Sequence, residues 1–144
     1  MAGSASHIRR AQDLDALAAV LPMAAADRYA EVLTEADVAT LKHLADTGMG
    51  ANTLRALASD LAYLEAWSQA VTGRPLPWPV DPELVLKFIA HHLWDPDQKA
   101  LDPDHGMPES VIDDLWDRKI LKVRGPHAPK TVSRRLSNWA TLHQ

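Results

Sequence analysis

The strongest constraint on this fold is a stripe of apolar residues at helical spacing in the middle of the chain. The stripe consists of Leu54, Leu57, Leu61, Leu64 and Ser68, with Ala58 and Trp67 beside it. Intervals of three and four residues place these side chains on one side of an α-helix. The opposite side shows Arg55, Ser59, Ala62 and Gln69. We expect a helix that Asn52 or Thr53 caps and that ends around residues 71–73.

Other helices carry explicit start signals. Thr34 followed by Asp37 approximates a capping box, and Gly48 marks the end of that helix. Alternating prolines in residues 75–79 exclude a helix there. Asp81-Pro82-Glu83 then starts another helix, with a capping Asp, Pro at the first position and an acid in the first turn. Its expected apolar face is Leu84, Val85, Phe88, Ile89 and Leu93.

The second half of the chain alternates loops and helices. Residues 95–106 are predicted to form an acidic loop and residues 123–129 a second loop. Between them, a helix from Pro108 to about Ile120 is expected to turn Val111, Ile112, Leu115 and Trp116 inward. The last helix covers 129–143, with an apolar stripe of Val132, Leu136, Trp139 and Leu142. No strand pattern occurs, so we predict an all-α bundle of four to six helices.

Length and composition exclude several classes of protein. A chain of 144 residues is typical of one domain, here residues 34–144 with an N-terminal arm or accessory helix over 1–33. The sequence has no cysteine, which excludes disulfide scaffolds and Cys-ligated zinc. No apolar run is long enough to span a bilayer and the start lacks a secretory h-region, so a cytoplasmic protein without a membrane partner is expected. The chain stops while its last helix is in phase, which we interpret as a fragment of a longer protein.

Charge is distributed unevenly. All nineteen acidic residues lie at or before Asp117, whereas residues 118–144 hold seven basic residues and no acid. Such asymmetry fits either a polyanionic partner or a basic surface that pairs with the acidic one inside the fold. The sequence does not separate these two interpretations.

Motifs for catalysis or cofactor binding are missing. Adjacent His91 and His92 do not have the i, i+4 spacing of a zinc protease helix, and no phosphate-binding glycine loop or hydrolase elbow occurs. Asp95, Asp97, Asp102 and Asp104 lack the spacing of a calcium loop. The five tryptophans are expected to anchor the core, with base stacking as the alternative. We therefore predict no catalytic residue, metal or cofactor in this chain.

The polar side of the last helix combines cations with short hydrogen-bonding side chains. It carries Lys130, Ser133, Arg134, Arg135, Ser137, Asn138 and Thr141, and the start of the 52–71 helix similarly carries Asn52, Thr53, Arg55 and Ser59. Cations contact phosphates and short polar groups contact base edges. Taken alone, however, the pattern also fits a solvated amphipathic face.

The order of these segments resembles the core-binding domain of tyrosine recombinases (the phage-integrase family), of the Cre-like type. The similar parts are NTLRALASDLAYLEAWSQAV at 52–71, DPELVLKFIAHHL at 81–93 and PKTVSRRLSNWATLH at 129–143. The resemblance implies an orthogonal, SAM-like helical bundle that clamps duplex DNA through two helices in the major groove. It implies DNA-contact roles for Thr53, Arg55, Lys130, Thr131 and Arg134. Exposure on the same faces adds Asn52, Ser59, Ser133, Arg135 and Asn138.

Two departures from the family matter. Residues 95–128 are much longer than the family's connection, and the Arg, His and Tyr motifs of its catalytic domain are missing, so this chain is not expected to cut DNA. The resemblance implies a longer parent that integrates or recombines DNA as a tetramer, associated with the nucleoid of a bacterium or phage host. The alternative is a helical protein-interaction module with its interface at residues 95–117.

Overall fold

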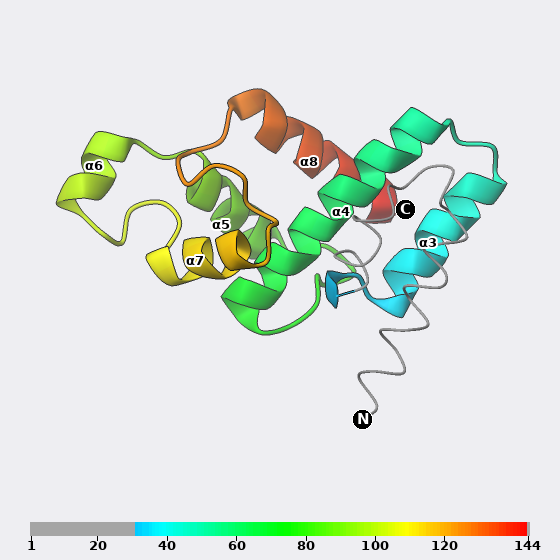
Figure 1. The fold of residues 1–144 in the computed structure, drawn as a ribbon, viewed down its shortest axis with the longest axis horizontal. Helices are drawn as coiled ribbons and strands as arrows, with labels where there is room; N and C mark the ends of the chain where they lie inside the picture. The colour runs from blue at the N-terminus through cyan, green and yellow to red at the C-terminus, as the bar shows by residue number, and fades with distance from the viewer. Residues whose placement is uncertain (1–30, 144) are drawn as a thin grey trace. The chain divides into compact units, whose positions relative to one another are not determined.

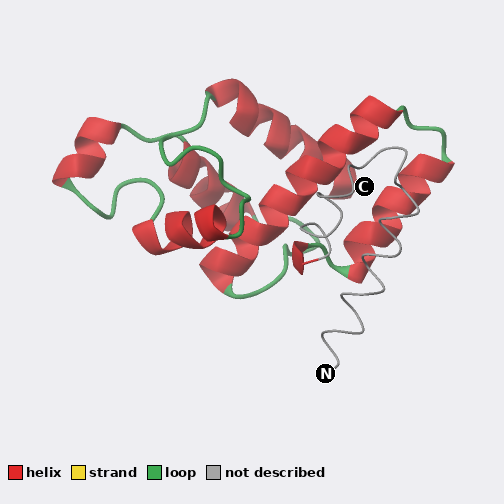
Figure 2. Ribbon diagram, viewed as in Figure 1, coloured by secondary structure: helices red, strands yellow, loops and turns green. Residues whose placement is uncertain are grey.

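The computed structural model describes residues 31–143 as helices joined by loops (Figure 1). The helices are α3 (Glu35–Asp46), α4 (Ala51–Thr72), α5 (Pro82–His92), α6 (Pro96–Leu101), α7 (Glu109–Asp117) and α8 (Pro129–His143). Figure 2 shows no strand in this part of the chain, which confirms the predicted all-α class. The chain divides into two compact units, Met1–Glu65 and Ala66–Gln144. The predicted boundary near residue 33 stays a prediction, because most of the predicted arm lies outside the described residues.

Helix α3 begins with the predicted capping box. The Thr34 hydroxyl accepts from the backbone N–H of Asp37 at 3.1 Å, and the Asp37 carboxylate accepts from the N–H of Thr34 at 3.0 Å. Two of the donors that every helix start leaves open are thereby satisfied. Gly48 follows the helix end with φ +88°, as predicted for a C-terminal glycine.

Helix α4 has the predicted end but a different start and a wider buried surface. It begins at Ala51, and the carbonyl of Gly50 accepts the first helical hydrogen bond from Leu54, so neither Asn52 nor Thr53 is the cap. The predicted stripe is buried. Every residue from Asp60 to Ser68 is also buried, including Ala62, which the pattern wrongly placed on the exposed side. Alanine is small enough to lie in a helix contact, so its position on the wheel did not decide its burial.

An aromatic cluster forms the core of the second unit. The Trp67 ring of α4 meets the Phe88 ring of α5 edge-on with centroids 5.0 Å apart. Phe88 in turn lies 6.4 Å from the ring of Trp139 on α8, also edge-on. Trp67 and Trp139 therefore confirm the predicted core role. Trp116 does not: it is 43% exposed rather than inward, and Trp78 is 40% exposed.

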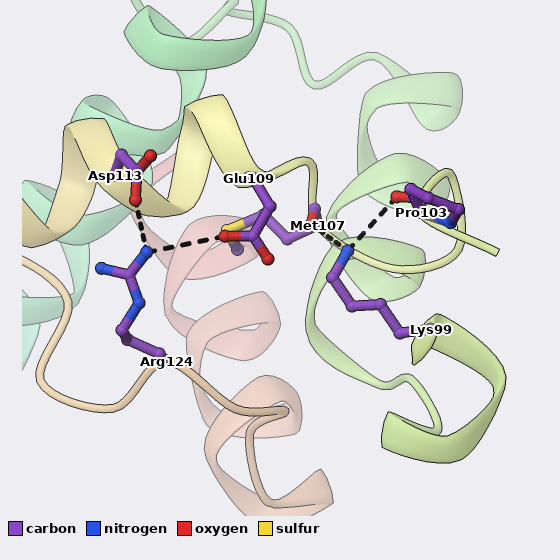
Figure 3. Close-up of polar contacts among 6 residues, drawn as sticks. All are labelled: Lys99, Pro103, Met107, Glu109, Asp113 and Arg124. Carbon is purple, nitrogen blue, oxygen red and sulfur yellow. Dashed lines mark hydrogen bonds and ion pairs between the residues drawn. The ribbon is translucent and has the colours of Figure 1, made fainter. Parts of the chain in front are cut away.

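The predicted acidic loop contains a helix. Asp95 caps α6 by accepting from the N–H of Asp97, the same arrangement as Asp81 and Glu83 at the start of α5. The Lys99 ammonium then donates to the carbonyl of His105 at 2.9 Å. It also donates to the carbonyls of Pro103 and Met107 at 3.4 and 2.6 Å (Figure 3). These hydrogen bonds close residues 95–107 around one cation, which explains why an acidic, proline-containing stretch is ordered.

Helix α7 is shorter than predicted. It covers Glu109–Asp117 rather than 108–120, and Lys119 has φ +62°, a conformation that no helix continues through. Val111, Ile112 and Leu115 are buried as expected.

We predict that Gly106→Ala destabilises the second unit. Gly106 has φ +75°, and a Cβ there would lie 2.6 Å from Cγ of Trp94. The left-handed backbone alone costs an alanine about 1–2 kcal/mol, and the contact with the indole adds to it. Denaturant titration should show a loss of at least that size. Gly125→Ala is the matched control, because a Cβ at Gly125 would lie 4.0 Å from its nearest neighbour and the backbone there is not left-handed. An equal loss of stability in both variants would contradict the prediction.

Candidate nucleic-acid interface

Helix α8 separates an apolar from a polar side as predicted. Of the predicted apolar stripe, Val132 and Trp139 are buried, whereas Leu136 and Leu142 are half-buried. The exposed residues are Pro129, Lys130, Ser133, Arg134, Ser137, Ala140 and Thr141. Lys130, Arg134 and Ser137 follow one another at intervals of four and three residues, so they share one face of the helix. No acidic residue occurs in α8. The exposed face therefore presents cations and short hydroxyls together.

Three predicted contact residues of α8 lie at the edge of this face. Thr131, Arg135 and Asn138 are half-buried. The Arg135 guanidinium donates to Nδ1 of His127 at 3.1 Å, so it is held by the loop before the helix. Arg134 and Arg135 were both predicted to contact DNA, but Arg134 is exposed whereas Arg135 is half-buried.

The start of α4 forms a second polar face, which belongs to the first unit. Asn52, Thr53, Arg55 and Ser59 are all exposed. The Asn52 carboxamide oxygen accepts from the Arg55 guanidinium at 3.1 Å, one turn apart on the helix. The four predicted residues therefore share the solvent-facing side of the first two turns.

The basic segment before α8 is partly neutralised inside the second unit. Arg118 lies 3.3 Å from the Asp114 carboxylate and donates to Gln69. Arg124 pairs with Asp113 and with Glu109 (Figure 3). Its guanidinium lies 5.4 Å from the centre of the Trp116 ring. For these two arginines, the pairing of basic with acidic surface inside the fold is confirmed.

A histidine cluster that sequence reasoning missed lies between α5 and α8. Trp67 donates its indole N–H to Nδ1 of His91 at 3.2 Å. The carbonyl of Phe88 lies 2.6 Å from Nδ1 of His92, which must donate because a carbonyl only accepts. The ring of His127 lies 4.8 Å from that of His92, and its backbone N–H donates to the carbonyl of His92 at 2.8 Å. Nothing in the spacing of residues 92 and 127 indicates this contact, because the intervening loop closes it.

Burial keeps these three histidines neutral. It lowers the pKa of His92 to about 3, against the opposing hydrogen bond to Phe88. It lowers the pKa of His91 to about 4, with Lys87 and Lys99 acting in the same direction. It lowers the pKa of His127 to about 4, aided by the neighbouring Arg135. The cluster therefore contributes no cation to the basic surface near neutral pH.

A pair of carboxyl groups lies in the first unit. Burial raises the pKa of Asp37 on α3, while hydrogen bonds from Glu65 on α4 and from Thr34 oppose that rise. A hydrogen bond between two carboxyl groups requires a proton on one of them. This contact connects α3 and α4 within the first unit.

The described residues contain neither a grouped metal site nor a membrane-spanning helix. No three or more histidine or carboxylate side chains of residues 31–143 are grouped to hold a metal ion. Over the same residues, no helix combines the length and the apolar character needed to cross a bilayer. Comparisons of the chain with family models, with curated proteins and with solved structures gave no match.

We predict that stability falls as the pH is lowered from about 6.5 to 4. In this range the unfolded chain protonates His91, His92 and His127, whose pKa values in the folded state lie at about 4, 3 and 4. The unfolded state thus binds more protons, and unfolding near pH 5 should take up about three of them. Free energies of unfolding from denaturant titrations across this pH range give the number of protons taken up on unfolding. His127→Asn should reduce it by about one, whereas His43→Gln, at an exposed site, should leave it unchanged.

Proposed function

We propose that this chain binds duplex DNA through the exposed face of α8 and, in the other unit, through the start of α4. The observation that carries the proposal is the α8 face, which exposes Lys130 and Arg134 beside hydroxyl groups and contains no acid. Polyphosphates attract such a face by counterion release, and short polar side chains between the cations reach base edges. A major groove accommodates one α-helix of this kind.

The predicted contact residues of α8 fall into two groups by the length of their side chains. Lys130 and Arg134 are long cations suited to phosphates, which position a protein on DNA. Ser133, Thr131 and Asn138 are short and suited to base edges, which give sequence specificity. In the first unit, Arg55 and Thr53 lie at a helix start whose open N–H groups and dipole favour a phosphate, and Asn52 and Ser59 lie beside them.

The resemblance to tyrosine recombinases refines this proposal. It supports an orthogonal, SAM-like core-binding domain whose longer parent protein integrates or recombines DNA as a tetramer in the nucleoid. The all-α class and the three similar segments, which form α4, α5 and α8, agree with that assignment. In such a parent a separate catalytic domain supplies the tyrosine nucleophile, so the present chain contributes binding and no chemistry or cofactor.

Arg134→Ala should weaken DNA binding about tenfold and reduce the dependence on salt by about one unit of slope. If four phosphates are neutralised, log K against log salt should have a slope of roughly −3.6 in the unmodified chain. Fluorescence anisotropy with a labelled duplex at several salt concentrations measures both quantities. Lys87→Ala removes the same charge from an exposed site on α5 and should change DNA binding little.

Asp97→Ala, which removes an acidic side chain, should not weaken DNA binding. Equal losses from Arg134→Ala and Lys87→Ala would remove α8 as the binding face.

A helical protein-interaction module is the second candidate. Leu101 on α6 is 89% exposed and Leu86 on α5 is 66% exposed, although both are large and apolar. The internal pairing of Arg118 and Arg124 also lowers the charge available to a polyanion. This function requires no binding of duplex DNA at low salt and a protein partner whose binding is lost in Leu101→Ser.

A further inference from the structure

The Arg135 guanidinium on α8 is held by a histidine of the preceding loop. Side chains on a helix point toward its N-terminus, so that of Arg135 reaches back to the loop in which His127 lies. The guanidinium donates to Nδ1 of His127 at 3.1 Å. A guanidinium has only donors, so Nδ1 must hold a lone pair and the ring proton must sit on Nε2. The contact exists only while His127 is neutral.

His127 is fixed to α5 as well as to Arg135. Its N–H donates to the carbonyl of His92, and the two rings meet edge-on at 4.8 Å. His92 from α5 and Arg135 from α8 are titratable and charged groups that face its ring. His91, next to His92 on α5, disfavours charge on His92. Because α5 holds the ring in place, His127 cannot follow Arg135 if the guanidinium moves outward.

We propose that His127 is a proton-dependent latch on Arg135, so that binding of duplex DNA at α8 is coupled to uptake of one proton. DNA phosphate draws the guanidinium away, which breaks its hydrogen bond to Nδ1. Nδ1 then accepts a proton from solvent, and no covalent bond changes. The inference rests on the proposed DNA binding and adds its regulation: a lower pH should strengthen binding. The low pKa of His127, about 4, agrees with a latch that is closed in the unbound chain near neutral pH.

Calorimetric titration with a mixed-sequence duplex tests the coupling. Measured between pH 7.5 and 5.5 in buffers of different ionisation enthalpy, it gives the number of protons taken up on binding. We expect uptake to increase as the pH falls, to at most one proton, with affinity rising by no more than tenfold per pH unit, because burial still opposes a charge on His127. His127→Asn keeps an acceptor for Arg135 but cannot titrate, so it should bind like the unmodified chain at pH 7.5 and lack that uptake. His43→Gln should behave like the unmodified chain.

The outcomes separate the two proposals. Binding without proton uptake, or with equal uptake in His127→Asn, overturns the latch and leaves DNA binding intact. Absence of binding at every pH overturns both. A second measurement needs no DNA: in Arg135→Met, nuclear magnetic resonance should show the pKa of His127 raised, because the neighbouring cation is gone. An unchanged pKa of His127 in that variant also overturns the latch.

Discussion

The contact of Phe88 with two tryptophans determines which face of α8 reaches solvent. Phe88 meets Trp67 of α4 on one side and Trp139 of α8 on the other, both edge-on. Edge-to-face aromatic pairs add about 0.5–1.5 kcal/mol each to the burial of their surface. With Trp139 turned toward α5 and Val132 buried, the helical repeat leaves Lys130, Arg134 and Ser137 on the outer side. The candidate interface is therefore a consequence of core packing.

Local start signals in the sequence predicted the helices well. Thr34 with Asp37, and Asp81 with Pro82, act over three or fewer residues, so neither needs a distant partner. The same signal at Asp95-Pro96-Asp97 was interpreted as a loop because acids and a further proline follow it. What orders that stretch is the Lys99 ammonium with its three carbonyl acceptors. Lysine is ordinarily solvated, and its hydrogen bonds depend on loop geometry that periodicity does not contain.

The candidate site was predictable in its faces and not in its individual contacts. Helical spacing alone placed Lys130, Ser133 and Arg134 together on the exposed side of α8. It also grouped Arg135 with them, since adjacent positions differ by only one step around the helix. The His127 ring, brought back by the 118–128 loop, gives Arg135 a different environment. The predicted exposure of Ala62 was also wrong, because α4 is buried around its whole circumference between residues 60 and 68.

Internal pairing accounts for two arginines of the basic segment but not for three of its lysines. The pairing of Arg118 with Asp114, and of Arg124 with Asp113 and Glu109, satisfies basic residues inside the second unit. Lys119, Lys122 and Lys130 are exposed and have no ion pair among residues 31–143. Surface pairs of this kind are weak and are screened by salt, so a polyanion competes with them at modest cost. Arg135 is different, because a neutral imidazole holds it. In the proposed latch, release of Arg135 depends on a proton rather than on salt, so the pH dependence of DNA binding would separate its contribution from that of the other cations.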